Sequence, residues 1–132
     1  MQKPAASALC PCHHGKFGEC CLRFLSGRHI PENALELMRS RYTAYVLGNE
    51  NYLKATWYIS SRPFGKLLDK NTSIKWINLK IISHKQDNKW GEVEFIAQYK
   101  INGKAQKLHE KSRFVKEDDR WYYLDGDLHN KP

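Results

Sequence analysis

The 132-residue sequence has no apolar run near the roughly 20 residues that a membrane-spanning helix requires, so we expect no membrane segment. Its first nine residues contain one lysine and an apolar stretch shorter than the roughly 7 to 15 residues of a signal-peptide core. We therefore expect a cytoplasmic protein. Internal repeats and low-complexity segments are also absent, and 132 residues with 41% hydrophobic content have room for one core-bearing domain.

The chain has no run of five basic residues, although Lys and Arg outnumber Asp and Glu by 22 to 14 and give a net charge of +8. Such a charge favours encounter with nucleic acid, ribosomes or acidic protein surfaces, but it does not define a site. The four tryptophans are more typical of core or rim positions than of base-stacking platforms, and no RNA-reading motif is present. We expect no sequence-specific binding of nucleic acid, and the sequence indicates no oligomeric state.

Cysteine is absent outside residues 10–21. Two closely spaced thiol pairs flank a loop of seven residues, and the four cysteines are Cys10, Cys12, Cys20 and Cys21. In a reducing compartment such a cluster favours metal ligation over disulfides. Thiolates select zinc or iron, and four protein ligands leave no open coordination position. The sequence therefore predicts one structural metal ion, zinc, with iron as the alternative.

Other interpretations of the cysteine cluster stay open at this stage. The four thiols can be reduced groups that only pack together, or two of them can form a redox dithiol. His13 and His14 lie within the loop, and either can replace one thiolate as a ligand. Adjacent loop histidines are more often exposed than ligated.

The segment that follows the cluster has a helical pattern. Residues 9–27 hold too few apolar side chains to form a core of their own, so the segment needs a cross-link such as a bound metal to be stable. Pro31 opens a helix that runs to Leu47, and Gly48 ends it. A short second helix is expected over residues 51–57, and residues 66–70 suit one more helical turn.

From Ile74 onward the hydrophobic period changes from 3.6 to 2, which predicts strands. Further strands are expected over 93–101, 106–115 and 121–124, and Asn102-Gly103 predicts a tight hairpin between the first two of these. The order of elements predicts an α+β domain, in which helices pack on a curved four-stranded antiparallel sheet. The space between helices and sheet is the expected pocket.

The sequence also resembles known families. Cys-Pro-Cys, a glycine-bearing loop and Cys-Cys resemble the SEC-C motif, a metal-binding tail known from the SecA preprotein translocase. Residues 34–46, 108–114 and 121–126 are similar to the bacterial YchJ family, and the likeness covers about residues 10–127. It implies a SEC-C-like metal-binding knuckle over 1–28 and a nuclear transport factor two-like (NTF2-like) cone over 29–132. It implies no particular activity.

Several polar residues are candidates for a pocket in the cone. Arg41 shares a helical face with Tyr42 and Tyr45, and a buried arginine needs a carboxylate or a bound anion. Strand alternation places Glu110 and Ser112 on one face and His109 on the other. We expect a buried Arg41–Glu110 pair, either fixing helix against sheet or binding a ligand. The pocket candidates are Arg41, Tyr42, Tyr45, His109, Glu110, Ser112, Trp121 and Asp125.

Two functions from different classes fit these observations. The first is a non-enzymatic module whose metal knuckle docks on the ribosome, on protein-export components or on another acidic protein surface. The second is a small-molecule-binding or catalytic cone in which the knuckle is only structural. His84, His109 and Asp125 can supply a base and its orienting carboxylate, but no spacing brings them together, so we expect no enzyme. We also expect knuckle and cone to have separate sources of stability.

Overall fold

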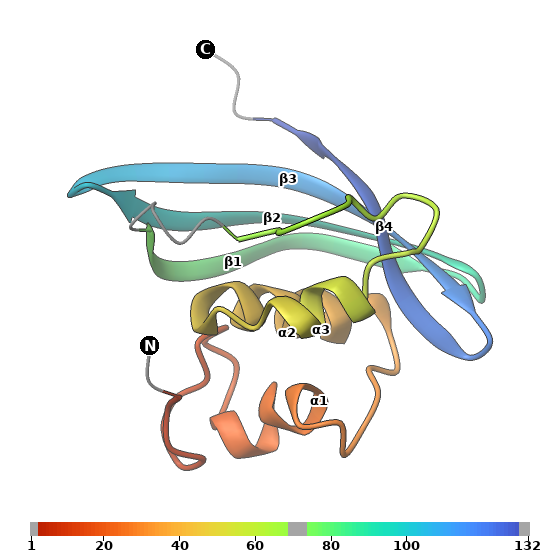
Figure 1. Ribbon diagram of the computed structural model, residues 1–132, viewed down its shortest axis with the longest axis horizontal. Helices are drawn as coiled ribbons and strands as arrows, with labels where there is room; N and C mark the ends of the chain where they lie inside the picture. The colour runs from red at the N-terminus through yellow and green to blue at the C-terminus, as the bar shows by residue number, and fades with distance from the viewer. Residues whose placement is uncertain (1–2, 69–73, 130–132) are drawn as a thin grey trace.

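A computed structural model describes residues 3–68 and 74–129 of the chain. Its helices lie on one face of a curved antiparallel sheet with strand order β1-β2-β3-β4 (Figure 1). The elements in chain order are η1 (Phe17–Glu19), α1 (Leu22–Leu25), α2 (Ala34–Leu47), α3 (Glu50–Ala55), β1 (Ile74–Gln86), β2 (Trp90–Ile101), β3 (Lys104–Glu117) and β4 (Arg120–Leu128). The predicted α+β meander is confirmed.

Capping residues set the ends of α2. The Asn33 side chain accepts a hydrogen bond of 2.8 Å from the Glu36 backbone N–H, so the helix begins three residues later than Pro31 suggests. Gly48 ends it with a φ of 72°, as predicted. The extra helical turn expected over 66–70 is not formed at residues 66–68, and its last two residues lie outside the described residues.

The sheet is built from hairpins between neighbouring strands. Asn102 and Gly103 join β2 to β3 with φ values of 51° and 81°, which confirms the predicted tight turn. Each strand pair is antiparallel, and all strands run longer than their hydrophobic segments suggest. The register of β3 against β4 shifts between Arg113 and Phe114, a bulge that increases the local twist.

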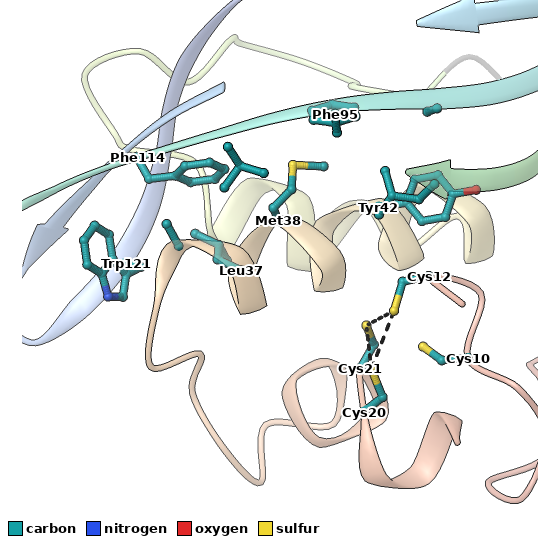
Figure 2. Close-up of a cluster of buried hydrophobic side chains, with 14 of the residues drawn as sticks. Cys10, Cys12, Cys20, Cys21, Leu37, Met38, Tyr42, Phe95, Phe114 and Trp121 are labelled. Atoms are coloured by element: carbon teal, nitrogen blue, oxygen red, sulfur yellow. Dashed lines mark hydrogen bonds between the residues drawn. The ribbon is translucent and has the colours of Figure 1, made fainter. Parts of the chain in front are cut away.

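Helix α2 lies between the sheet and the cysteine segment. Figure 2 shows Phe95 and Phe114 of the sheet on one side of α2 and the four cysteines on the other. Its buried residues are Ala34, Leu37, Met38, Ser40, Arg41, Tyr42, Thr43 and Ala44. The cysteines and the sheet residues belong to one continuous core. This packing does not favour separate sources of stability, and both that expectation and the boundary at residue 28 stay predictions.

Candidate metal centre

The chain folds back on itself to bring the first two cysteines to the second pair. The Cys10 backbone N–H donates to the Gly15 carbonyl at 2.9 Å, and the His13 N–H donates to the Cys10 carbonyl at 2.8 Å. This tight loop requires left-handed backbone at His13 (φ 65°) and Gly15 (φ 77°). An antiparallel bridge between Leu9 and Lys16 closes its base. Short helices η1 and α1 then place the second cysteine pair opposite the first.

The four Sγ atoms are buried and lie within 4.8 Å of one another. The Sγ atoms of Cys12 and Cys20 are 3.6 Å apart, those of Cys12 and Cys21 3.8 Å, and those of Cys20 and Cys21 3.9 Å. A tetrahedron of thiolates about zinc, with Zn–S near 2.3 Å, has edges of about 3.8 Å. A disulfide needs about 2.05 Å, and none of the four cysteines is disulfide-bonded. The residues thus fit one tetrahedral ion.

The electrostatics of the cluster call for a cation. Hydrogen bonds from the neighbouring thiols lower the pKa of the Cys10 thiol. The pKa of Cys20 and that of Cys21 are raised instead, first by their hydrogen bonds with Cys10 and Cys12 and then by burial. Four buried thiolates at these distances would repel one another, and a positive ion between them would offset that repulsion. A bound divalent metal supplies that charge and keeps all four thiols deprotonated.

Two side chains of α2 contact the loop that carries Cys10 and Cys12. The Thr43 hydroxyl, which is fully buried, lies 3.7 Å from the Cys10 Sγ and can donate to its thiolate. The Arg39 Nη1 donates to the Cys12 carbonyl at 3.3 Å. Neither residue was among the sequence candidates. Such partners orient metal ligands and tune their affinity for the ion.

The two histidines of the loop are not part of the ligand group. His13 and His14 are exposed, and the atoms that lie within 4.8 Å of one another come from the four cysteines alone. The alternative in which a histidine replaces a thiolate is not supported by this geometry. Every ligand position of the tetrahedron is filled by sulfur.

Residues 33–126 match a family model described as the YchJ middle NTF2-like domain. The chain belongs to the YchJ family. A UPF0225 protein from Chromobacterium violaceum is 46% identical over 129 residues, which cover 94% of this chain and 96% of that one. A UPF0225 protein from Cupriavidus pinatubonensis is 45% identical over 132 residues, covering 94% of this chain and 91% of the relative. The predicted family is therefore confirmed.

Solved structures of similar proteins support the same assignment. A SEC-C motif containing protein from Rhodopseudomonas palustris has a TM-score of 0.80 at 29% identity and covers 93% of this chain and 100% of that chain. Another from Psychrobacter arcticus has a TM-score of 0.74 at 27% identity, covering 96% of this chain and 86% of that chain. The SEC-C resemblance of the cysteine segment is thus matched by the fold. Within the described residues, no helix is long and apolar enough to cross a membrane.

The YchJ domain buries Arg41 without the predicted carboxylate partner. Arg41 is 3% exposed, and among the described residues no ion pair joins it to Glu110. Its Nη1 donates instead to the Leu53 carbonyl at 2.8 Å and to the Thr56 hydroxyl at 2.7 Å. The predicted direct pair is wrong, because α3 places a carbonyl and a hydroxyl nearer to the guanidinium.

Aromatic rings complete the surroundings of Arg41. Its guanidinium lies 4.6 Å from the ring centre of Tyr123 and 5.1 Å from that of Trp57. Cation–π contacts of this kind offset part of the desolvation of a buried charge. Burial nevertheless lowers the pKa of Arg41.

Glu110 faces the interior, as strand alternation predicts. Its Oε2 accepts hydrogen bonds from the Ser112 hydroxyl at 2.6 Å and from the Tyr123 hydroxyl at 3.2 Å. Burial, followed by the charge of Glu110, raises the pKa of Tyr123. Glu110 is thus fixed within the sheet, and Tyr123 links its carboxylate to the ring that lies against Arg41.

The remaining pocket candidates pack in the core, and Tyr45 also lies beside Arg41. Tyr42 and Tyr45 contact Trp76 of β1, with ring centres 5.7 Å and 6.1 Å away. Trp121 is 4% exposed, and its indole N–H donates to the Glu32 carbonyl at 3.3 Å, which fixes the segment before α2. These side chains hold helix against sheet.

His109 and Asp125 lie on the outer face of the sheet, away from Glu110. The His109 Nε2 is 2.7 Å from the Glu94 Oε2, and the Arg113 Nε donates to the Asp125 Oδ1 at 2.6 Å. His84 is exposed on β1. The suggested pairing of a histidine with Asp125 as base and orienter is therefore wrong, since each has a different partner.

Removing the Thr43 hydroxyl tests its contact with the metal ligand. We expect Thr43→Val, which keeps the side-chain shape, to weaken zinc binding by about tenfold, as loss of a partner of a metal ligand commonly does. Competition with a coloured chelator measures the affinity. Thr43→Ser retains the donor and is expected to bind zinc as the wild type does. Equal affinity in all three proteins would contradict this role.

Proposed function

We propose that the chain is a zinc-binding, non-enzymatic interaction module of the cytoplasm, whose knuckle docks on the ribosome or on protein-export components. The observation that carries this proposal is the closed ligand set, in which four buried cysteines fill a tetrahedron. A metal with four protein ligands has no position for a substrate or an activated water. Its role is to fix the shape of the surface around it.

The exposed basic side chains of the knuckle favour an acidic partner. Residues 3–28 contain four basic side chains and one acidic side chain, Glu19, and the buried thiolates with a divalent ion would add a charge of about −2 beneath them. Lys16 and Arg28 are exposed, so their charges are available to another surface. Such contacts direct encounter and weaken with salt.

The metal itself is tested by elemental analysis of untagged protein. We expect about one zinc ion per chain, with iron as the alternative, and less than a tenth of an ion would contradict the assignment. Chelation is expected to lower the Tm of the whole chain by more than about 5 °C, because a ligand of the native state adds its binding free energy to folding. Because the cysteines share one core with the sheet, we expect one thermal unfolding transition, and chelation should move it to lower temperature.

Docking is tested by cosedimentation with purified ribosomes at low and moderate salt. We expect the double variant Lys16→Glu, Arg28→Glu to lose most binding, since it reverses two exposed charges of the knuckle without changing a ligand. The control variant Lys85→Glu, Lys89→Glu makes the same charge change at the β1–β2 hairpin, and we expect it to bind as the wild type does. Cys10→Ser, Cys12→Ser should also lose binding. Absence of binding by the wild type, or equal binding by both charge variants, would overturn ribosome docking by the knuckle.

A second candidate is a site for small anions inside the cone. Arg41 is buried without an ion pair among the described residues, and the indole Nε1 of Trp57, whose ring it contacts, is buried with no hydrogen-bond partner there. A buried unpaired donor costs about 1–3 kcal/mol, which a bound acceptor would offset. A carboxylate or phosphate ligand has the chemistry that both groups require.

Thermal shift with small carboxylates and inorganic phosphate tests this candidate. A ligand at 100 times its Kd adds about 2.7 kcal/mol to stability, so the wild-type Tm should rise by several degrees. Arg41→Gln should abolish the shift, whereas Arg113→Gln on the outer face should retain it. If no anion shifts the wild type, or if Arg41→Gln responds equally, the cone has no such site.

A further inference from the structure

Within residues 3–68 and 74–129, the outer face of the sheet carries no helix, since the helices lie on its other face (Figure 1). Charge is distributed unevenly on it. We call the end near the β2–β3 turn the lysine half and the opposite end the paired half. The lysine half comprises the outward residues Lys75, Asn78, Lys80, Ile96, Gln98, Lys100, Ala105, Lys107 and His109. The paired half comprises Ser83, Lys85, Glu92, Glu94, Lys111, Arg113, Asp125 and Asp127.

Strand register sets the arrangement of the lysine half. Lys75 lies directly opposite Lys100, Gln98 lies between Asn78 and Lys107 in the next row, and Lys80 lies opposite Ile96 in the row beyond. Side chains on one face of a sheet repeat at about 7 Å along a strand and 4.8 Å between strands. The lysines therefore form a compact group, and no acidic residue occupies these three rows.

Every carboxylate of the paired half has a basic partner. Glu92 lies 3.8 Å from both Lys85 and Lys111, and Glu94 lies 2.7 Å from His109 at the border between the halves. Arg113 contacts Asp125 at 2.6 Å and Asp127 at 2.7 Å. The acidic groups of this face are thus already engaged and do not neutralise the lysine half.

Three lysines of the lysine half carry charge that the fold itself does not use. Lys75, Lys80 and Lys100 are exposed and have no ion pair among the residues that the structure describes. Like charges directly opposite each other destabilise a strand pair, which is the position of Lys75 and Lys100. A bound polyanion would relieve this repulsion.

We propose that the lysine half binds the phosphate backbone of RNA without regard to sequence. Lysine, asparagine and glutamine side chains are common donors to phosphate and sugar oxygens, and they make up most of this surface. Its residues include no Phe, Tyr or Trp on which a base could stack, and its one imidazole, that of His109, is stacked on His129 with ring centres 5.1 Å apart and lies 2.7 Å from the Glu94 carboxylate. It also lacks the aromatic or arginine anchors that dominate protein–protein interfaces, which disfavours an acidic protein as its partner.

This surface is separate from the knuckle. The cysteine segment and the outer face of the sheet lie on opposite sides of α2 (Figure 1). A test with free RNA contains no ribosome and no other protein. Its result is therefore independent of whether the knuckle docks on any partner.

Fluorescence anisotropy with a labelled, unstructured 20-nucleotide uridine RNA measures the interaction. With three to four phosphate contacts, the affinity of the wild type should fall roughly 20- to 50-fold between 50 and 200 mM salt. The triple variant Lys75→Gln, Lys80→Gln, Lys100→Gln should bind at least about tenfold more weakly at 50 mM, and its salt slope should shrink by about 2. Its Tm should not fall, because the opposed lysine pair is removed.

The matched control is Lys66→Gln, Lys85→Gln, Lys89→Gln, which changes net charge equally at exposed positions elsewhere. It should keep the wild-type affinity within about twofold and the same salt slope. Equal losses in the two variants would show that net charge alone attracts RNA and would overturn the proposal. Failure of the wild type to bind at 50 mM would do the same. Displacement of RNA by polyglutamate at equal charge concentration would reassign the surface to an acidic protein.

Discussion

The packing of α2 between the sheet and the cysteine loop is the constraint on which the rest of the structure depends. The helix packs on the sheet with one side and on the cysteine loop with the other, so its polar side chains need partners in both directions. Arg41 donates a hydrogen bond to the Leu53 carbonyl. Thr43 lies about 200° further around the helix and contacts the Cys10 Sγ. Ser40 bonds to the Tyr52 hydroxyl at 2.7 Å. The cysteine cluster and the sheet therefore pack on opposite sides of the same helix, which explains why they share a core.

Much of the fold follows from local patterns in the sequence. The change of hydrophobic period at Ile74 separates helices from strands, and Asn102-Gly103 suits the left-handed backbone of the β2–β3 turn. The four cysteines were identifiable as candidate metal ligands by spacing alone, since no other cysteine competes with them, and the structure brings their Sγ atoms within 4.8 Å of one another. Helix ends were less predictable. At the start of α2, the side-chain cap of Asn33 outweighs the preference of Pro31 for a first turn.

The partners of buried polar groups were not predictable in the same way. Alternation correctly put Glu110 on the inner face, but its hydrogen bond to Tyr123 depends on how β4 pairs with β3 past the bulge after Arg113. The partner of Arg41 is a backbone carbonyl, which no side-chain pattern reveals. Thr43 gave a weak signal, as a hydroxyl in a buried helix, but its contact with Cys10 joins residues 33 positions apart. Such contacts are products of tertiary packing.

The closed metal site and the ion pairs of the sheet limit where this molecule can act on others. Four thiolates with one divalent ion would carry a charge of about −2, buried on the side of α2 that faces away from the sheet. On the outer face, Arg113 already holds Asp125 and Asp127, so a partner gains little there. Lys75 and Lys100 repel each other within the fold, so their charge is available to an external anion. The unpaired lysines on the outer face and the closed set of four cysteines therefore favour binding at the surface over a reaction at the metal.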